Sequence, residues 1–152
     1  MPVSFTQEEA YAFLDSKPGF LILTTVGKEG FPHSVPVGYF RVDDCVYVGG
    51  RAKSQRIKNV QRNPKVSVLL EKSGNRREDL QGLMLQGEAD IISEPDQVLW
   101  LLREAASQRG TPESDLPTEP RAGASYIRIR PSHSISWDYS RGDFPTSRII
   151  GH

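Results

Sequence analysis

About seven short apolar runs, separated by turns, constrain the fold of this chain more than any other feature of its sequence. In the run 83–92, apolar residues alternate with polar ones, as in a strand with one buried face. In the run 20–26, apolar residues occupy both faces, as in a strand at the centre of a sheet. The runs are 20–26, 31–40, 46–48, 66–70, 83–92, 125–130 and 134–139. Strands of this length and spacing predict a mainly β fold, a closed β-barrel with α-helices at its ends.

Three short helices are expected between these strands. Thr6 and Glu9 have the spacing of a capping box, so a helix is expected to begin after Thr6. A second helix is expected to begin after Ser54, which is a good N-cap residue. A third helix runs through the apolar positions of 98–105. The helices are therefore few and short, and the strands dominate the fold.

The length of 152 residues fits a single domain. We expect the barrel to be a cofactor-binding domain over residues 1–140. Residues 141–152 are expected to form a loosely ordered C-terminal tail.

Composition argues against several functional classes. The chain has 19 basic and 19 acidic residues, so its formal charge is zero and any site for an anion must be local. One cysteine, Cys45, excludes an internal disulfide framework, and three histidines make a zinc cluster unexpected. The N-terminus lacks the pattern of a secretory signal, and no apolar run is long enough to span a bilayer. We therefore expect a cytoplasmic protein with no membrane partner and no metal site.

One stretch departs from this neutrality. Between Gly49 and Lys65 the sequence has six basic residues and no acidic one. They are Arg51, Lys53, Arg56, Lys58, Arg62 and Lys65. Because positive charge at a helix N-terminus is unfavourable unless an anion is present, this stretch is a candidate binding site.

The helix after Ser54 places one arginine beside the core. At about 100° per residue, Ile57 and Val60 form the buried stripe, and Arg56 lies about 40° from Val60. Backbone amides, the Ser54 hydroxyl and the Arg56 guanidinium would then converge at the helix N-terminus, an arrangement that suits a phosphate. Lys53 would close this site from the other side, and the glycines Gly49–Gly50 would let a ligand approach the backbone.

Three other interpretations compete with a phosphate site. A basic helix is commonly just a solvated surface. Binding of nucleic acid through residues 51–65 would favour aromatic residues among the charges, and the stretch has none. A haem carrier would need an axial ligand, for which His33 and His133 are the candidates.

The order of the motifs resembles a known superfamily. Residues 54–64, SQRIKNVQRNP, follow the pattern S-x-[KR]-x-[KR]-N-[LV]-x-x-[ND]-P between two strands. Residues 23–37 are similar to the hairpin L-x-T-x-x-x-x-G-x-P-x-x-x-P-V, and 86–89 and 135–138 to two later strands. Together these resemble the pyridoxamine 5'-phosphate oxidase-like split-barrel superfamily of flavin and deazaflavin oxidoreductases. The stretches KSQR and SWD most resemble its actinobacterial deazaflavin-linked branch.

The resemblance implies a six-stranded split β-barrel that works as a homodimer with cofactor sites at its interface. The implied cofactor is coenzyme F420 or FMN, with haem in some branches. It also implies an oxidoreductase that transfers a hydride between the cofactor and a small conjugated or aromatic substrate. A cofactor carrier without turnover is the alternative. No general acid or base is apparent in the sequence, and the catalytic residues stay unassigned. The substrate-binding C-terminal extension of true pyridoxamine 5'-phosphate oxidase has no counterpart around Arg148 and His152, so we do not predict vitamin B6 chemistry.

The resemblance also assigns roles to residues of this chain. Ser54, Arg56 and Lys58 would hold the cofactor phosphate, beside Gly49 and Gly50. The strand 34–37 would run under the ring, and Gln81 and Gly82 would approach from the second subunit. Trp137 is a candidate for ring contact, with packing in the core or the dimer as its alternative. The complete set of cofactor-binding candidates is Ser34, Val35, Pro36, Val37, Gly49, Gly50, Lys53, Ser54, Gln55, Arg56, Lys58, Gln81, Gly82 and Trp137.

Overall fold

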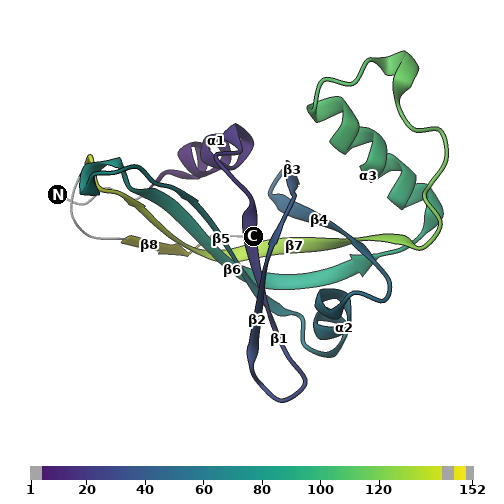
Figure 1. The fold of residues 1–152 in the computed structure, drawn as a ribbon, viewed down its shortest axis with the longest axis horizontal. Coiled ribbons are helices and arrows are strands. Elements are labelled where there is room, and N and C mark those ends of the chain that lie inside the picture. Colours follow the sequence, from purple (N-terminus) through teal and green to yellow (C-terminus); the bar gives the residue numbers. More distant parts are fainter. Residues whose placement is uncertain (1–4, 142–145, 150–152) are drawn as a thin grey trace.

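A computed structural model describes residues 5–141 and 146–149 of the chain. One antiparallel sheet of eight strands dominates it, with three α-helices and two short 3₁₀-helices around the sheet (Figure 1). The elements are α1 (Gln7–Ser16), β1 (Leu21–Val26), β2 (Pro32–Val37), β3 (Phe40–Val42), β4 (Cys45–Arg51), α2 (Gln55–Arg62), β5 (Lys65–Lys72), η1 (Arg77–Asp79), β6 (Gln81–Ile92), α3 (Pro95–Gln108), η2 (Glu113–Asp115), β7 (Ala124–Asp138) and β8 (Thr146–Ile149). None of the helices within the described ranges is long and apolar enough to cross a membrane.

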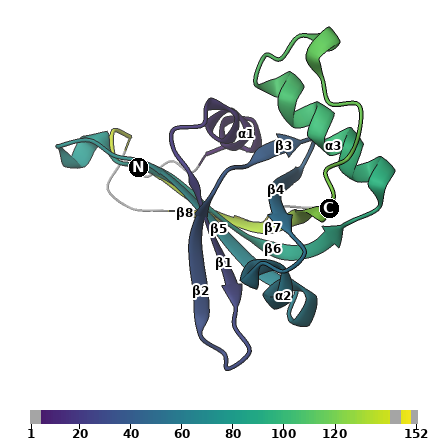
Figure 2. The ribbon, with the colours of Figure 1, turned by 45° about the vertical axis from the view of Figure 1, so that its right-hand side comes forward.

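The strand order explains why the barrel is split. The sheet runs β2-β1-β5-β6-β7-β4-β3, and β8 adds to β7. The two edge strands, β2 and β3, follow each other in the chain and are joined by Gly38 and Tyr39. The sheet therefore curls until its edges meet at a covalent link, without a ladder between them in the described residues (Figure 2). The predicted mainly β split barrel with helices is confirmed. Its sheet adds the three-residue β3 and the four-residue β8 to the six strands expected.

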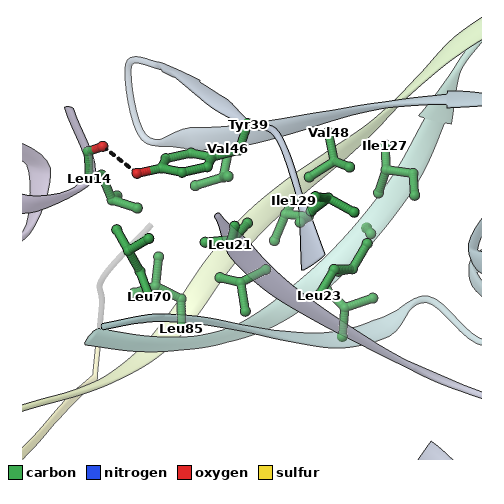
Figure 3. Packing of buried hydrophobic residues seen from close by; sticks show 14 of the residues in the cluster. Leu14, Leu21, Leu23, Tyr39, Val46, Val48, Leu70, Leu85, Ile127 and Ile129 are labelled. Carbon is green, nitrogen blue, oxygen red and sulfur yellow. Dashed lines mark hydrogen bonds between the residues drawn. The ribbon is translucent and has the colours of Figure 1, made fainter. Parts of the chain in front are cut away.

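The core lies inside this curled sheet. Alternate residues of β1, β4 and β7 point into it, among them Leu21, Leu23, Val48 and Ile127, all fully buried (Figure 3). Tyr39, at the seam between the edge strands, donates a hydrogen bond of 2.6 Å from its hydroxyl to the Leu14 carbonyl oxygen. Burial raises the pKa of Tyr39 to about 12. This tyrosine therefore ties α1 to the seam of the barrel.

The predicted capping box of the first helix is present in full. The Glu9 amide donates to the Thr6 hydroxyl at 3.1 Å, and the Thr6 amide donates to the Glu9 carboxylate at 3.3 Å. The helix ends at Lys17, a C-cap in the left-handed conformation with φ of 49°. Its backbone amide donates to the Leu14 carbonyl oxygen. Lys17 also donates from Nζ to the Tyr39 carbonyl oxygen, so it lies beside the link between β2 and β3.

The C-terminal third differs from the sequence expectation. The runs 125–130 and 134–139 were expected to be separate strands, but they form the single strand β7. The reason is a bulge: Gln86 of β6 pairs with His133 and Gly87 pairs with Pro131. Pro131 cannot donate to a ladder, and the bulge accommodates it without ending the strand. Within the expected C-terminal tail, Thr146–Ile149 pair with β7 as β8.

Candidate functional site

The connection between β4 and α2 builds the first part of the site. As predicted, α2 begins after Ser54 and buries Ile57 and Val60. It also buries Asn59 completely, which the apolar pattern did not indicate. The Asn59 amide group donates to the Thr25 hydroxyl on β1 at 3.0 Å. This buried hydrogen bond fixes the helix against the sheet, so its N-terminus has a defined position.

Two polar residues of α2 serve this anchor instead of the site. Gln55 donates from its side-chain amide to the Asn59 Oδ1 atom at 2.8 Å. Arg62 donates to the same oxygen at 3.0 Å and to the Val26 carbonyl oxygen at 3.1 Å. Both are therefore occupied on the side of α2 that faces β1. Lys58 is exposed and points away from the sheet, as the helical geometry predicted.

A cavity of about 930 Å³ opens where β4 passes into α2. Its size lies within the usual range for small-molecule sites. Among the residues that line it are five of the predicted ones, namely Gly49, Gly50, Lys53, Ser54 and Arg56. A side chain at position 50 would crowd the start of α2, because a Cβ atom there would lie 3.1 Å from Ile57 Cδ1 and 3.6 Å from Ser54 Oγ.

Hydrogen-bond donors without acceptors gather at this N-terminus. Ser54 occupies the N-cap position, but its side chain forms no capping hydrogen bond. Its Oγ atom and the Arg56 Nε atom are buried and have no hydrogen-bond partner among the described residues. The Arg56 guanidinium is held in place by its Nη2 group, which donates to the Gly49 carbonyl oxygen at 2.9 Å. The first three amides of α2 also lack helical acceptors. The arrangement fits an anion with several acceptor oxygens.

The other wall of the cavity comes from the start of β7. Gly49, Gly50 and Arg51 of β4 pair with Tyr126, Ser125 and Ala124 of β7. This pairing brings Arg121, which the sequence reading missed, to the same cavity.

Arg121 and Tyr126 add a charge and an aromatic face. Burial raises the pKa of the Tyr126 hydroxyl, and the positive charges of Arg121 and Arg109 oppose this shift. The local signal for this wall was weak. The sequence offers only one indication: Arg121 stands next to the small residues Ala122–Ser125, just as Arg51 stands next to Gly49 and Gly50.

The candidate ring strand lies elsewhere. On β2, Ser34 and Pro36 are exposed on the outer face, whereas Val37 is 7% exposed and packs in the core. Val35 is partly buried against the same core. Ser34 shares a hydrogen bond of 2.7 Å with the Thr24 hydroxyl. None of these four predicted residues lines the cavity beside α2, so the outer face of β2 is a separate surface.

The last three predicted residues lie together at the far end of β6 and β7. Gly82 pairs with Trp137, and the indole packs so closely that a Cβ atom on Gly82 would lie 2.0 Å from Cζ2. Gln81 donates to the Asp138 carboxylate at 3.1 Å. Tyr126 and Trp137 are eleven positions apart on β7, which is roughly 35 Å along an extended strand. One chain therefore does not bring Gln81, Gly82 or Trp137 to the cavity beside α2.

Within the described residues, no cluster of three or more histidine, cysteine, aspartate or glutamate side chains could hold a metal ion. His33 and His133 do not line the cavity beside α2. Cys45 is buried, and burial raises the pKa of its thiol. The site is therefore a cationic and aromatic cavity built from β4, α2 and the start of β7.

Comparison with known proteins identifies related chains. The sequence profile of the family described as pyridoxamine 5'-phosphate oxidase matches residues 6–137. No curated protein matches the sequence significantly.

Solved structures share this fold. A conserved hypothetical protein from Mycobacterium tuberculosis has a TM-score of 0.80 and 25% identity, over 98% of this chain and 94% of its own. A structure named F420 reductase has a TM-score of 0.62 and 22% identity, over 83% and 96%. A haem-binding protein from Mycobacterium smegmatis has a TM-score of 0.64 and 15% identity, over 97% and 60%.

Proposed function

Because this chain belongs to the pyridoxamine 5'-phosphate oxidase family, whose profile spans most of its length, we propose that it binds a phosphate-bearing flavin-type cofactor, FMN or coenzyme F420. One observation carries the proposal. The Ser54 hydroxyl and the Arg56 Nε atom are buried at the start of α2 without hydrogen-bond partners among the described residues. Buried polar groups are rarely left unpaired, so a ligand with acceptor oxygens is expected there.

The residues of the cavity fit such a ligand. Ser54, Arg56 and the first amides of α2 would hold the phosphate. Lys53 and Arg121, which both line the cavity, would add positive charge. Gly49 and Gly50 would let the cofactor approach the end of β4, and Tyr126 would supply an apolar face. The exposed Lys58 is a partner only for a longer anionic tail, which F420 has and FMN lacks.

We propose that the protein is an oxidoreductase for a small conjugated or aromatic substrate, and that it is not pyridoxamine 5'-phosphate oxidase itself. When bound and reduced, a flavin-type cofactor supplies a hydride, that is, two electrons and one proton. The role of this chain is to bind and orient the two molecules and to exclude water. The sequence has no dinucleotide fingerprint of the G-x-G-x-x-G type, so a tightly held nicotinamide is not part of the proposal.

We also propose that the protein works as a homodimer. Gln81, Gly82 and Trp137 lie too far from α2 to join the cavity within one chain, so a second copy is needed if they contact the cofactor. Light scattering at micromolar concentration is expected to give twice the chain mass of 17.0 kDa. A particle of the single-chain mass would contradict a site at the dimer interface.

The alternative is a cofactor carrier without turnover. A haem carrier is not favoured by this cavity, because neither His33 nor His133 lines it. A role in nucleic-acid binding is not proposed. Arg62 is tied to Asn59 and Val26, and the stretch 51–65 has no aromatic residue on which a base could stack.

Titration of the purified apo-protein with FMN and with F420, at low and high salt, tests the cofactor. We expect F420 affinity to fall more steeply with salt, because its polyanionic tail would meet the exposed Lys53 and Lys58. If FMN binds more tightly and both respond alike, the preference for F420 is wrong. If neither binds below about 100 µM, which corresponds to about 5.5 kcal/mol, the oxidoreductase proposal fails.

A further inference from the structure

A second cavity, of about 450 Å³, adjoins the one beside α2. It lies between the C-terminal ends of α1 and α3 and the seam of the barrel, where Gly38 and Tyr39 link β2 to β3. Gly49 and Tyr126 line both cavities. A molecule in the second cavity would therefore be separated from a cofactor in the first only by the backbone of β4 and one tyrosine ring.

The walls of the second cavity are aromatic. Phe40 and Tyr126 are 5% and 7% exposed, and their rings meet edge to face at 5.7 Å. Phe20 also lines the cavity, yet 72% of its surface is exposed. A phenylalanine this exposed beside a cavity offers apolar contact to a ligand that enters. The lining thus suits an apolar, aromatic ring.

Two cations face this apolar space. Lys17 and Arg109 both line the cavity, and they follow α1 and α3 as the C-cap residues of these helices. The Lys17 Nζ group donates to the Tyr39 carbonyl oxygen at 2.6 Å. Burial lowers the pKa of Lys17, and the charge of Arg109 lowers it further. Both side chains line the same cavity, so two like charges face one space.

The charge of Asp15 offsets part of this effect by raising the pKa of Lys17, but no carboxylate pairs directly with either cation among the described residues. Neither Lys17 nor Arg109 belongs to an ion pair formed within the described ranges 5–141 and 146–149. The nearby Asp15 is taken by Arg41, with which it pairs at 2.6 Å. The helix dipole explains why a cation stands at each helix end. It does not explain why both cations converge on one aromatic cavity, which a bound anion would explain.

We propose that the second cavity binds the substrate, and that this substrate is an aromatic or conjugated carboxylate whose anionic group lies between Lys17 and Arg109. Its ring would pack against Phe40 and Tyr126, next to the cofactor cavity. The assignment rests on the proposed function, since the substrate bound in this cavity would accept a hydride from the cofactor of an oxidoreductase. The carboxylate has two conceivable sources, a substrate or the tail of F420, and the experiment separates them.

Calorimetric titration with 2-naphthoate, and with the uncharged 2-naphthamide as its matched probe, tests the proposal. We expect the acid to bind at least about tenfold more tightly than the amide, because charge-assisted hydrogen bonds are stronger than hydrogen bonds between neutral groups. Arg109→Gln and Lys17→Gln should each weaken the acid about tenfold and leave the amide unchanged. Arg109→Lys should retain most of the affinity. Lys28→Gln, in the β1–β2 turn, is the remote charge control.

The titrations are performed without cofactor and with saturating FMN or F420. Loss of naphthoate binding can then be distinguished from loss of cofactor binding. Binding of naphthoate in all three conditions supports a substrate subsite. Displacement by F420 but not by FMN would assign the cations to the cofactor tail and overturn the proposal. Equal affinity for acid and amide, no effect of Arg109→Gln, or no binding with and without FMN would also overturn it.

Discussion

Replacement of Arg56 by alanine is expected to weaken binding of FMN or F420 by about 1.5–3 kcal/mol, roughly 10–150-fold. Arg56 Nε is buried without a partner among the described residues, and Nη2 already bonds to Gly49. The guanidinium therefore keeps one donor without a protein partner and is held in a fixed position beside the cavity. Because its partner would be an ionised phosphate, the loss should reach the upper range for one hydrogen bond. Fluorescence or calorimetric titration of the apo-protein measures it.

Two further variants make this result specific. Lys28→Ala removes a positive charge from the exposed β1–β2 turn and should leave cofactor affinity nearly unchanged. Arg56→Lys keeps the charge but loses the planar fork, so it should fall between Arg56→Ala and the parent. If Arg56→Ala binds as tightly as Lys28→Ala, the cofactor phosphate does not lie at the start of α2.

Replacement of Gly87 by alanine is expected to lower the free energy of unfolding by about 2–4 kcal/mol. A Cβ atom at this position would lie 2.1 Å from the Arg130 carbonyl oxygen and 2.8 Å from the carbonyl carbon. Both are backbone atoms of β7, and strand pairs on either side of the bulge hold β6 and β7 together. The clash can be relieved only by moving a strand.

Thermal unfolding at a fixed protein concentration checks this prediction, with an expected fall in Tm of roughly 5–15 °C. Gly19→Ala is the matched control, because nothing lies within 4 Å of a Cβ atom there. It should change Tm little. A Gly87→Ala variant as stable as Gly19→Ala would mean that β6 and β7 can separate at the bulge without cost.

Much of the fold follows from local patterns. Alternation along residues 83–92 predicts the buried face of β6, and the spacing of Ile57 and Val60 predicts the buried stripe of α2. The capping box at Thr6 sets the start of α1. These predictions succeed because period and capping depend on residues within a few positions of one another. The same holds for the phosphate candidates of β4 and α2, which are neighbours in sequence.

The remainder depends on pairings between distant segments. The contact of Ser125 with Gly50 spans 75 residues, and no local pattern indicates it. Arg121 and Tyr126 therefore escaped the sequence reading, as did the second cavity, whose walls come from five separate segments. The bulge opposite Pro131 was missed for a related reason. A proline in the sequence predicts the end of a strand unless a bulge in the pairing with the neighbouring strand is known to accommodate it.

The position of β7 in the sheet has a consequence for how the chain folds during synthesis. β7 lies between β6 and β4, and it is the last long strand to leave the ribosome. The segment from β1 to β6 can form its own ladders first, through turns and one helix. The barrel cannot close until residues 124–129, which pair with β4, have emerged, and until then β4 and β6 each present an unpaired edge. Closure by such a late, non-local strand is slow and leaves a window for aggregation on those two edges.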